Sequence, residues 1–134
     1  MILIDAGPLI AIVKRDDQHH ADCKSALATI RQPMVTVWPV LTEVMFLLAM
    51  VPGGQEQVWK MFERGVVQLL PLGSDDVSRI RELMHQYADL PMDLADAALI
   101  RVGEREGIHE FFTVDRKDFS VYRIHGRIRP RTLP

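Results

Sequence analysis

Short apolar runs alternate with longer, mixed stretches along the chain, and this alternation predicts the order of its elements. Strands are predicted where a few apolar or β-branched residues are bounded by polar or turn residues. These runs are 1–4, 34–38, 66–70 and 111–114, with 122–124 as a candidate fifth strand. The first run is continuously apolar, which is typical of a strand in a parallel sheet that is covered on both faces.

The stretches between these runs carry helical periodicity. Gly7 is expected to turn the chain, and Pro8 suits the first position of a helix. Pro39 is also expected to begin a helix, and Gly65 and Gly107 are expected to end two others. The predicted helices cover 16–30, 39–50, 55–64, 74–87 and 93–106. Strands that alternate with helices predict right-handed crossovers and a parallel α/β sheet.

Composition narrows the class of protein. The 134 residues are 48% apolar, which suits one domain over 1–134 with its own core. The formal net charge of −2 excludes a uniformly basic nucleic-acid binder, although residues 116–134 carry six Lys or Arg against one acid. The single cysteine, Cys23, excludes an internal disulfide, and the longest apolar stretch contains Glu43 and is too short to cross a bilayer. We therefore expect a cytoplasmic protein with no membrane association.

Four acidic residues stand in unusually apolar surroundings. Asp5 and Asp115 each follow a predicted strand, and the carboxyl ends of parallel strands form the edge where ligands bind. Glu43 lies in an apolar helix. Asp96 lies among alanines, three positions after Asp93 and on the same helix face. One shared site explains these positions more simply than four separate roles.

Each acid also has a purely structural interpretation. Asp5, Asp93 and Asp115 can cap helices, and Glu43 can extend from a helix edge into solvent.

If the acids share a site, two carboxylates about 4 Å apart repel by about 4 kcal/mol at an effective dielectric of about 20, so protonation or a cation is required. Oxygen ligands without Cys or His select Mg²⁺ or Mn²⁺, and such ions promote phosphodiester hydrolysis.

Four motifs make the chain similar to a known family. "ILIDAGPLIA" opens the chain, "TEV" lies in an apolar helix, "DLADAALI" lies in a later helix, and "FFTVDRKDF" comes near the end. In this order and spacing they resemble the PIN-domain family, and more narrowly the VapC-like ribonuclease toxins of toxin–antitoxin modules. The resemblance covers nearly the whole chain and implies a PIN-like three-layer α/β/α fold with a central parallel sheet of four to five strands.

The same resemblance implies an activity and a set of partners. It implies a Mg²⁺- or Mn²⁺-dependent endoribonuclease that cuts RNA, often a structured RNA such as transfer RNA. It also implies a homodimer that a cognate antitoxin silences. The acids of the family map onto Asp5, Glu43, Asp96 and Asp115, and its hydroxyl residue maps onto Thr113. Ala6 is a departure, because many relatives have Ser or Thr there, and its loss is expected to loosen the metal without abolishing the site.

The expected roles divide these residues into ligands and supporting groups. Asp5 and Asp96 are expected to be direct metal ligands, and the other two acids complete the pocket directly or through water. Asp93 and Thr113 are expected to orient ligands or waters. The basic C-terminal stretch is the expected RNA contact, through Arg116, Lys117, Arg123 and Arg127, extended by Arg129 and Arg131.

Other functions and surfaces remain open at this stage. The main alternative is a PIN-like module that binds RNA or a protein without cleaving it, although the complete set of acids argues against it. A phosphoryl transferase with Asp5 as nucleophile is disfavoured, because Gly7 stands where that chemistry uses a second Asp. Trp38 and Trp59 are expected in core or dimer contacts rather than in base stacking. One apolar helix face within 39–64 is expected to bind a second copy or an antitoxin.

Overall fold

A five-stranded parallel sheet forms the centre of the protein in this computed structural model, which describes all residues 1–134. The order of the strands across the sheet is β3-β2-β1-β4-β5. The strands are β1 (Ile2–Ile4), β2 (Met34–Thr36), β3 (Val67–Leu69), β4 (Glu110–Phe112) and β5 (Arg131–Leu133). The chain therefore winds outward from β1 to β3 and returns to the other side of β1 for β4 and β5, which makes the gap between β1 and β4 a topological switch point.

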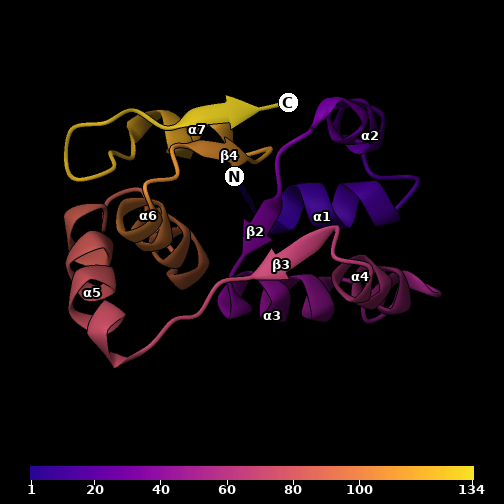
Figure 1. The fold of residues 1–134 in the computed structure, drawn as a ribbon, viewed down its shortest axis with the longest axis horizontal. Helices are drawn as coiled ribbons and strands as arrows, with labels where there is room; N and C mark the ends of the chain where they lie inside the picture. Colours follow the sequence, from indigo (N-terminus) through magenta and orange to yellow (C-terminus); the bar gives the residue numbers. More distant parts are fainter.

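Helices cover both faces of this sheet and complete three layers. Figure 1 shows α1, α2 and α4 on one side of the sheet and α5, α6 and α7 on the other, with α3 next to both α1 and α6. The helices are α1 (Ala6–Val13), α2 (His20–Thr29), α3 (Trp38–Leu47), α4 (Gly54–Glu63), α5 (Val77–Gln86), α6 (Leu94–Glu106) and α7 (Arg116–Val121), with a 3₁₀ turn at Ser74–Asp76. None of them is long and apolar enough to span a bilayer.

The predicted α/β class and the four main strands are confirmed, but two predicted helix starts are wrong. α1 begins at Ala6 rather than Pro8, because the Asp5 side chain accepts a hydrogen bond from the Ala6 N–H and caps the helix directly at the end of β1. α2 begins at His20 rather than at residue 16, since Asp17 instead accepts the His19 N–H in the preceding turn.

The prediction of a fifth strand at 122–124 is also wrong. Tyr122 and Ile124 are fully buried, but Ile124 forms an isolated antiparallel bridge with Ile128 in a tight turn. The edge of the sheet is filled instead by Arg131–Leu133, where the Thr113 N–H donates to the carbonyl of Leu133. Tyr122 and Ile124 are therefore buried because they pack in the hydrophobic core, and not because this segment pairs as a strand of the sheet. No range was predicted for helix α7, although Asp115, which caps it, was named as a possible helix cap.

Small residues on α6 bring this helix close to the sheet. Ala97 and Ala98 are completely buried. A Cβ at Gly103 would lie 2.8 Å from the carbonyl oxygen of Ile108, and 3.1 Å from the ring of Phe111 on β4. The close approach at Gly103 fixes the last turns of α6 against β4, and the buried alanines lie next to Asp96 in the first turn.

A buried acid, Asp76, fastens α6 to the segment before α5. Its carboxylate accepts the Gly73 N–H at 2.9 Å, Arg101 Nε at 2.8 Å and Arg105 Nη1 at 3.0 Å. These bonds hold the pKa of Asp76 below its usual value, with the Gly73 N–H as the largest cause. Nearby on α6, Glu104 receives two hydrogen bonds of 2.8 Å from Arg79 of α5. The two acids therefore fix the position of α6 along the sheet.

We predict that Asp76→Ala lowers the free energy of unfolding by about 2–3 kcal/mol, because it leaves two arginines and a backbone N–H without their partner. Urea denaturation measures the change. Asp75→Ala is the matched control, since Asp75 is exposed and its neighbour carries the contacts. Equal stability of the two variants would contradict this role for Asp76.

Candidate metal centre

Acidic side chains from four parts of the chain meet at the carboxyl edge of the sheet. Asp5 follows β1, and Asp115 follows β4 after two intervening residues. Glu43 lies on α3, Asp93 caps α6, and Asp96 lies in the first turn of α6. Burial, and after it repulsion from the neighbouring acids, raises the pKa of Asp5, Glu43 and Asp96, so the five predicted acids are close enough to interact electrostatically.

Asp5 is held by contacts to both of its oxygens. Oδ1 accepts the Ala6 N–H at 2.8 Å, and Oδ2 accepts the Thr113 hydroxyl at 3.1 Å. Gly7 permits this arrangement, because a Cβ at that position would overlap the side chain of Val114. Thr113, which the sequence singled out as a supporting residue, therefore contacts Asp5 directly from the segment after β4.

Asp93 and Asp96 share one face of α6, as their spacing predicted. Asp93 accepts the Asp96 N–H at 2.8 Å and caps the helix. The Asp96 side chain is only 9% exposed, and its Oδ2 accepts the hydroxyl of Tyr122 at 2.8 Å. Asp96 is therefore the most deeply placed acid of the site, and Asp93 lies nearer the surface.

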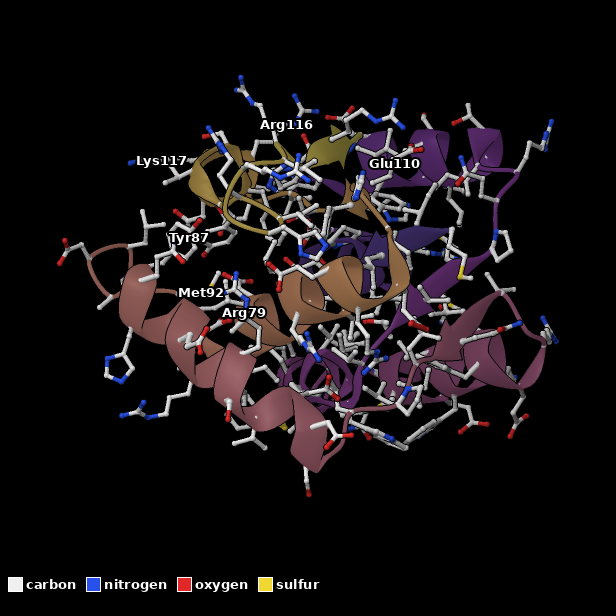
Figure 2. All side chains as sticks on the ribbon, turned by 60° about the vertical axis from the view of Figure 1, so that its left-hand side comes forward. Arg79, Tyr87, Met92, Glu110, Arg116 and Lys117 are labelled. Carbon is white, nitrogen blue, oxygen red and sulfur yellow. The ribbon has the colours of Figure 1, made fainter.

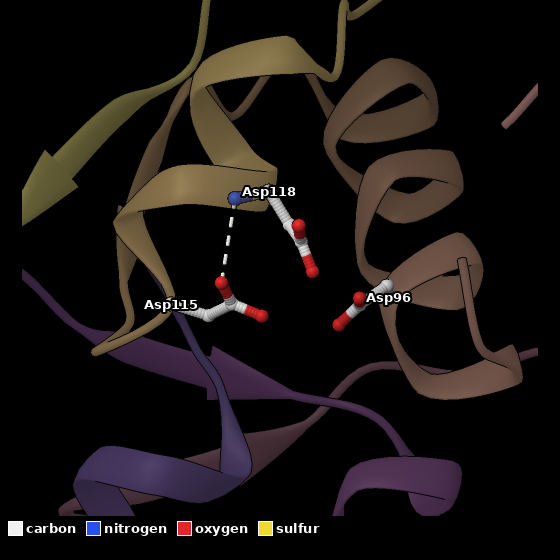
Figure 3. A group of neighbouring side chains, drawn as sticks. All are labelled: Asp96, Asp115 and Asp118. Carbon is white, nitrogen blue, oxygen red and sulfur yellow. Dashed lines mark hydrogen bonds between the residues drawn. The ribbon is translucent and has the colours of Figure 1, made fainter. Parts of the chain in front are cut away.

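Asp115 and Asp118 form a similar pair on α7. Asp115 caps that helix and accepts the Asp118 N–H at 3.3 Å, while its own N–H donates to the Thr113 hydroxyl at 3.0 Å. Figure 3 shows that both carboxylates face Asp96 across the gap between α7 and α6. One oxygen from each of these three aspartates lies within 4.8 Å of the others.

Sequence reasoning missed Asp118. Its signal was present, because Asp118 follows Asp115 by three positions, as Asp96 follows Asp93. No helix range was predicted over Arg116–Val121, and without a helix the spacing of three positions does not place Asp115 and Asp118 on one face. Asp5 and Glu43, by contrast, are not part of this group of three, although Asp5 interacts with Asp96, and Glu43 interacts with Asp5 and Asp93.

Burial and mutual repulsion together disfavour the charged forms of these acids. Loss of hydration, followed by repulsion from Asp5, raises the pKa of Asp96 to about 8, against the opposing effect of the Tyr122 hydroxyl. Loss of hydration also raises the pKa of Asp5 to about 6 and, with repulsion from Asp115, raises the pKa of Asp118. The pKa of Glu43 is raised by burial and by Asp93. None of these acids forms a salt bridge.

This donor set fits a hard divalent cation. All side chains that meet in the cluster offer carboxylate oxygens, with no Cys or His among them. Asp96, Asp115 and Asp118 could bind an ion directly, and Asp5 borders the same space. A cation would reverse the electrostatic penalty, because it favours the ionised form of each ligand.

A hollow of about 600 Å³ opens beside the acidic site. Glu43 and Asp93 line it, together with the apolar side chains of Trp38, Phe46 and Leu94. Trp38 is 56% exposed and Trp59 is 41% exposed, so neither tryptophan belongs to the core. Glu43 therefore stands between the acidic cluster and an accessible apolar surface.

The basic C-terminal stretch divides into bound and free side chains. Arg123 Nη1 donates to three carbonyls at the end of α7, Arg131 pairs with Glu110 at 2.9 Å, and Arg116 donates to the carbonyl of Pro134. Lys117 and Arg127 are exposed and have no protein partner. Figure 2 shows Arg116 and Lys117 at the outer surface of α7.

Sequence comparison agrees with this architecture. Residues 2–124 match the family model described as the PIN domain. The chain is also 24% identical over 135 residues to Ribonuclease VapC26 of Mycobacterium tuberculosis, an alignment that covers 99% of this chain and 100% of that protein.

Two solved structures share the fold. VapC20 of Mycobacterium tuberculosis, described as a sarcin–ricin loop cleaving toxin, superposes with a TM-score of 0.79 at 19% identity, over 87% of this chain and 92% of that one. A toxin–antitoxin complex from Klebsiella pneumoniae contains a chain that superposes with a TM-score of 0.68 at 22% identity, over 99% of this chain and 100% of that one. The three-layer fold predicted from the sequence is therefore confirmed.

We predict that Asp96→Asn stabilises the metal-free protein at pH 8 by up to about 5 kcal/mol. The pKa of Asp96 in the folded state, about 8, lies above its ordinary value of 3.8, so the folded state holds the proton more tightly. Its contribution to stability is present below about pH 4 and is lost as pH rises through about 8. Denaturation of wild type and variant in EDTA, from pH 4 to 9, measures the difference.

The gain in free energy of unfolding of Asp96→Asn over wild type should therefore grow with pH and should vanish near pH 4. Asp22→Asn on the exposed face of α2 is the control and should show no such trend. A variant that is less stable than wild type at every pH would identify Asp96 as a structural acid instead.

Proposed function

Because the chain belongs to the PIN-domain family, we propose that it is a VapC-type ribonuclease toxin that acts in the cytoplasm as a Mg²⁺- or Mn²⁺-dependent endoribonuclease. The observation that carries this proposal is the meeting of Asp5, Asp96 and Asp115 at the switch point of the sheet without a cationic partner. The similarity to Ribonuclease VapC26 over the full length of both chains supports the reaction class.

The proposed ligands come from three different segments. Asp96, Asp115 and Asp118 bind the ion, and Asp5 joins them with its orientation set by Thr113 and the Ala6 N–H. Asp93 orients Asp96 through the helix cap, and Glu43 binds at the mouth directly or through water. When bound, Mg²⁺ or Mn²⁺ supplies an activated water and charge stabilisation for hydrolysis of an RNA phosphodiester.

The substrate backbone is proposed to follow the free cations of the C-terminal segment. Lys117 lies between Asp115 and Asp118 in the first turn of α7, and Arg127 adds a further exposed positive charge. Arg123 and Arg131 support the fold through their own contacts, although their charge still adds to the local field. A structured RNA remains the expected substrate, and VapC20, a structural relative, is described as cleaving the sarcin–ricin loop.

An exposed apolar stripe supports the proposal of a protein partner. Trp38 and Phe46 of α3 line one hollow with Leu94 of α6, and the three side chains belong to residues that are 56%, 80% and 52% exposed. Contiguous apolar surface of this kind marks interaction sites in soluble proteins. A second copy of the chain and a cognate antitoxin are the partners we propose, and a structural relative comes from a toxin–antitoxin complex.

We predict that the purified protein cleaves RNA in Mg²⁺ or Mn²⁺ and that EDTA stops the reaction. Asp5→Asn and Asp96→Asn should each lower the cleavage rate at least about 100-fold, because each removes a charged ligand from the ion. A panel of structured RNAs that includes transfer RNAs and ribosomal hairpins, resolved on sequencing gels, measures the rate. Asp22→Asn is the control that should cleave at the wild-type rate.

Tight binding of these RNAs without cleavage in any metal would instead identify a non-cleaving PIN-like module. Cleavage that persists in EDTA, or in Asp96→Asn, would show that the acidic cluster is not the catalytic site.

We predict that Lys117→Gln weakens RNA binding and lowers its dependence on salt. Removal of one phosphate contact should reduce the slope of log Kd against log salt by about 0.7 for single-stranded RNA. Fluorescence anisotropy in the Asp96→Asn background measures binding without cleavage. Lys24→Gln on exposed α2, on the other side of the sheet, is the matched control. An unchanged slope in Lys117→Gln would place the RNA on another surface.

A further inference from the structure

Tyr122 directs its hydroxyl at the most buried acid of the site. The side chain is fully buried, and its O–H donates to Asp96 Oδ2 at 2.8 Å. No protein donor contacts the other oxygen, Oδ1, of Asp96. The two oxygens of this carboxylate therefore have different surroundings, because Oδ2 accepts the tyrosine hydroxyl and Oδ1 has no protein donor.

The ring of Tyr122 cannot easily turn away from Asp96. Tyr87 and Phe119 pack against it in edge-on geometry, each with a centroid distance of 5.1 Å. The backbone N–H of Tyr122 donates to the carbonyl of Asp118 at 3.1 Å. Tyr122 thus joins α7, which carries Asp115 and Asp118, to the acid on α6.

The choice of partner distinguishes Tyr122 from its neighbour Tyr87. Both rings belong to the same aromatic cluster, and both hydroxyls form a hydrogen bond. The hydroxyl of Tyr87 accepts the backbone N–H of Arg123 at 2.9 Å, which serves only the fold. The hydroxyl of Tyr122 instead contacts a carboxylate of the acidic cluster.

We propose that Tyr122 is a positioning residue that restricts Asp96 to binding the metal through Oδ1 alone. This inference rests on the proposed metal-dependent function. The hydrogen bond uses one lone pair of Oδ2 and fixes the plane of the carboxylate, so Oδ1 is the oxygen that we propose to bind the ion, in a fixed direction. Mg²⁺ requires near-ideal octahedral geometry, whereas Ca²⁺ accepts bidentate carboxylates and irregular geometry. The Tyr122 hydroxyl therefore favours the smaller ion at this site.

The test is metal binding to the full chain by isothermal titration calorimetry, without RNA. Tyr122→Phe keeps the ring but frees Oδ2, and we expect it to weaken Mn²⁺ and Mg²⁺ binding about 10-fold. Binding of Ca²⁺ should change less, so that the preference for Mg²⁺ over Ca²⁺ falls. Tyr87→Phe is the matched control and should keep both the affinity and the preference of wild type.

The preference between ions separates positioning from a general loss of structure. Loss of stability alone would weaken all three metals alike, and this outcome would overturn the proposal. Wild-type affinity in Tyr122→Phe would also overturn it. Asp96→Asn tests the underlying function separately. If that variant loses metal binding while Tyr122→Phe does not, the metal site stands and the role of Tyr122 falls. Unchanged binding in Asp96→Asn would contradict the metal site itself.

A crystal structure of the wild-type protein with Mn²⁺ provides a second measurement that does not depend on any variant folding. We expect Asp96 Oδ1 on the ion and the Tyr122 hydroxyl still within hydrogen-bond distance of Oδ2. A bidentate Asp96 with the tyrosine displaced would overturn the proposal.

Discussion

Repulsion among carboxylates that are brought together out of water is the constraint on which this structure depends. Asp5 and Asp96 lose hydration without gaining a salt bridge, and repulsion from Asp5 raises the free energy of the charged form of Asp96, as repulsion from Glu43 and Asp93 does for Asp5. Such an arrangement persists only if the rest of the fold is stable enough to impose it. The stability comes from the buried sheet and from ion pairs elsewhere, such as those of Asp76 with two arginines of α6 and of Glu104, on α6, with Arg79.

The scaffold limits this repulsion by giving backbone donors to the same acids. Asp5, Asp93 and Asp115 each cap the helix that follows them, and each accepts an N–H group from its first turn. A helix N-terminus also carries a partial positive charge that favours a carboxylate. Helix capping and site formation, which the sequence presented as alternatives, are therefore the same contacts. Three helices therefore begin at the carboxyl edge of the sheet, and the acid that caps each helix also belongs to the acidic site.

The C-terminal segment completes the site from the second side of the sheet. Helix α7 brings Asp115 and Asp118 to Asp96, and Tyr122 at its end donates to that acid. Arg123 caps α7, and Glu104 accepts the N–H of His125 in the turn that follows. A stretch that is rich in basic residues thus does two things. Part of it holds the segment in place, and part of it, including Lys117, remains free for an anionic ligand.

The sequence by itself determined the α/β class, the four main strands and the acids at their ends, because burial periodicity and turn residues are local properties of the chain. It also marked Asp93 and Asp96 as one face of a helix, since their spacing is local. It did not determine β5, α7 or Asp118, because a short basic segment has no periodicity of its own and is ordered by contacts with distant residues. The contact between Tyr122 and Asp96 joins residues 26 positions apart. Only the tertiary structure could decide it, because the packing of α7 against α6 sets which oxygen the hydroxyl reaches.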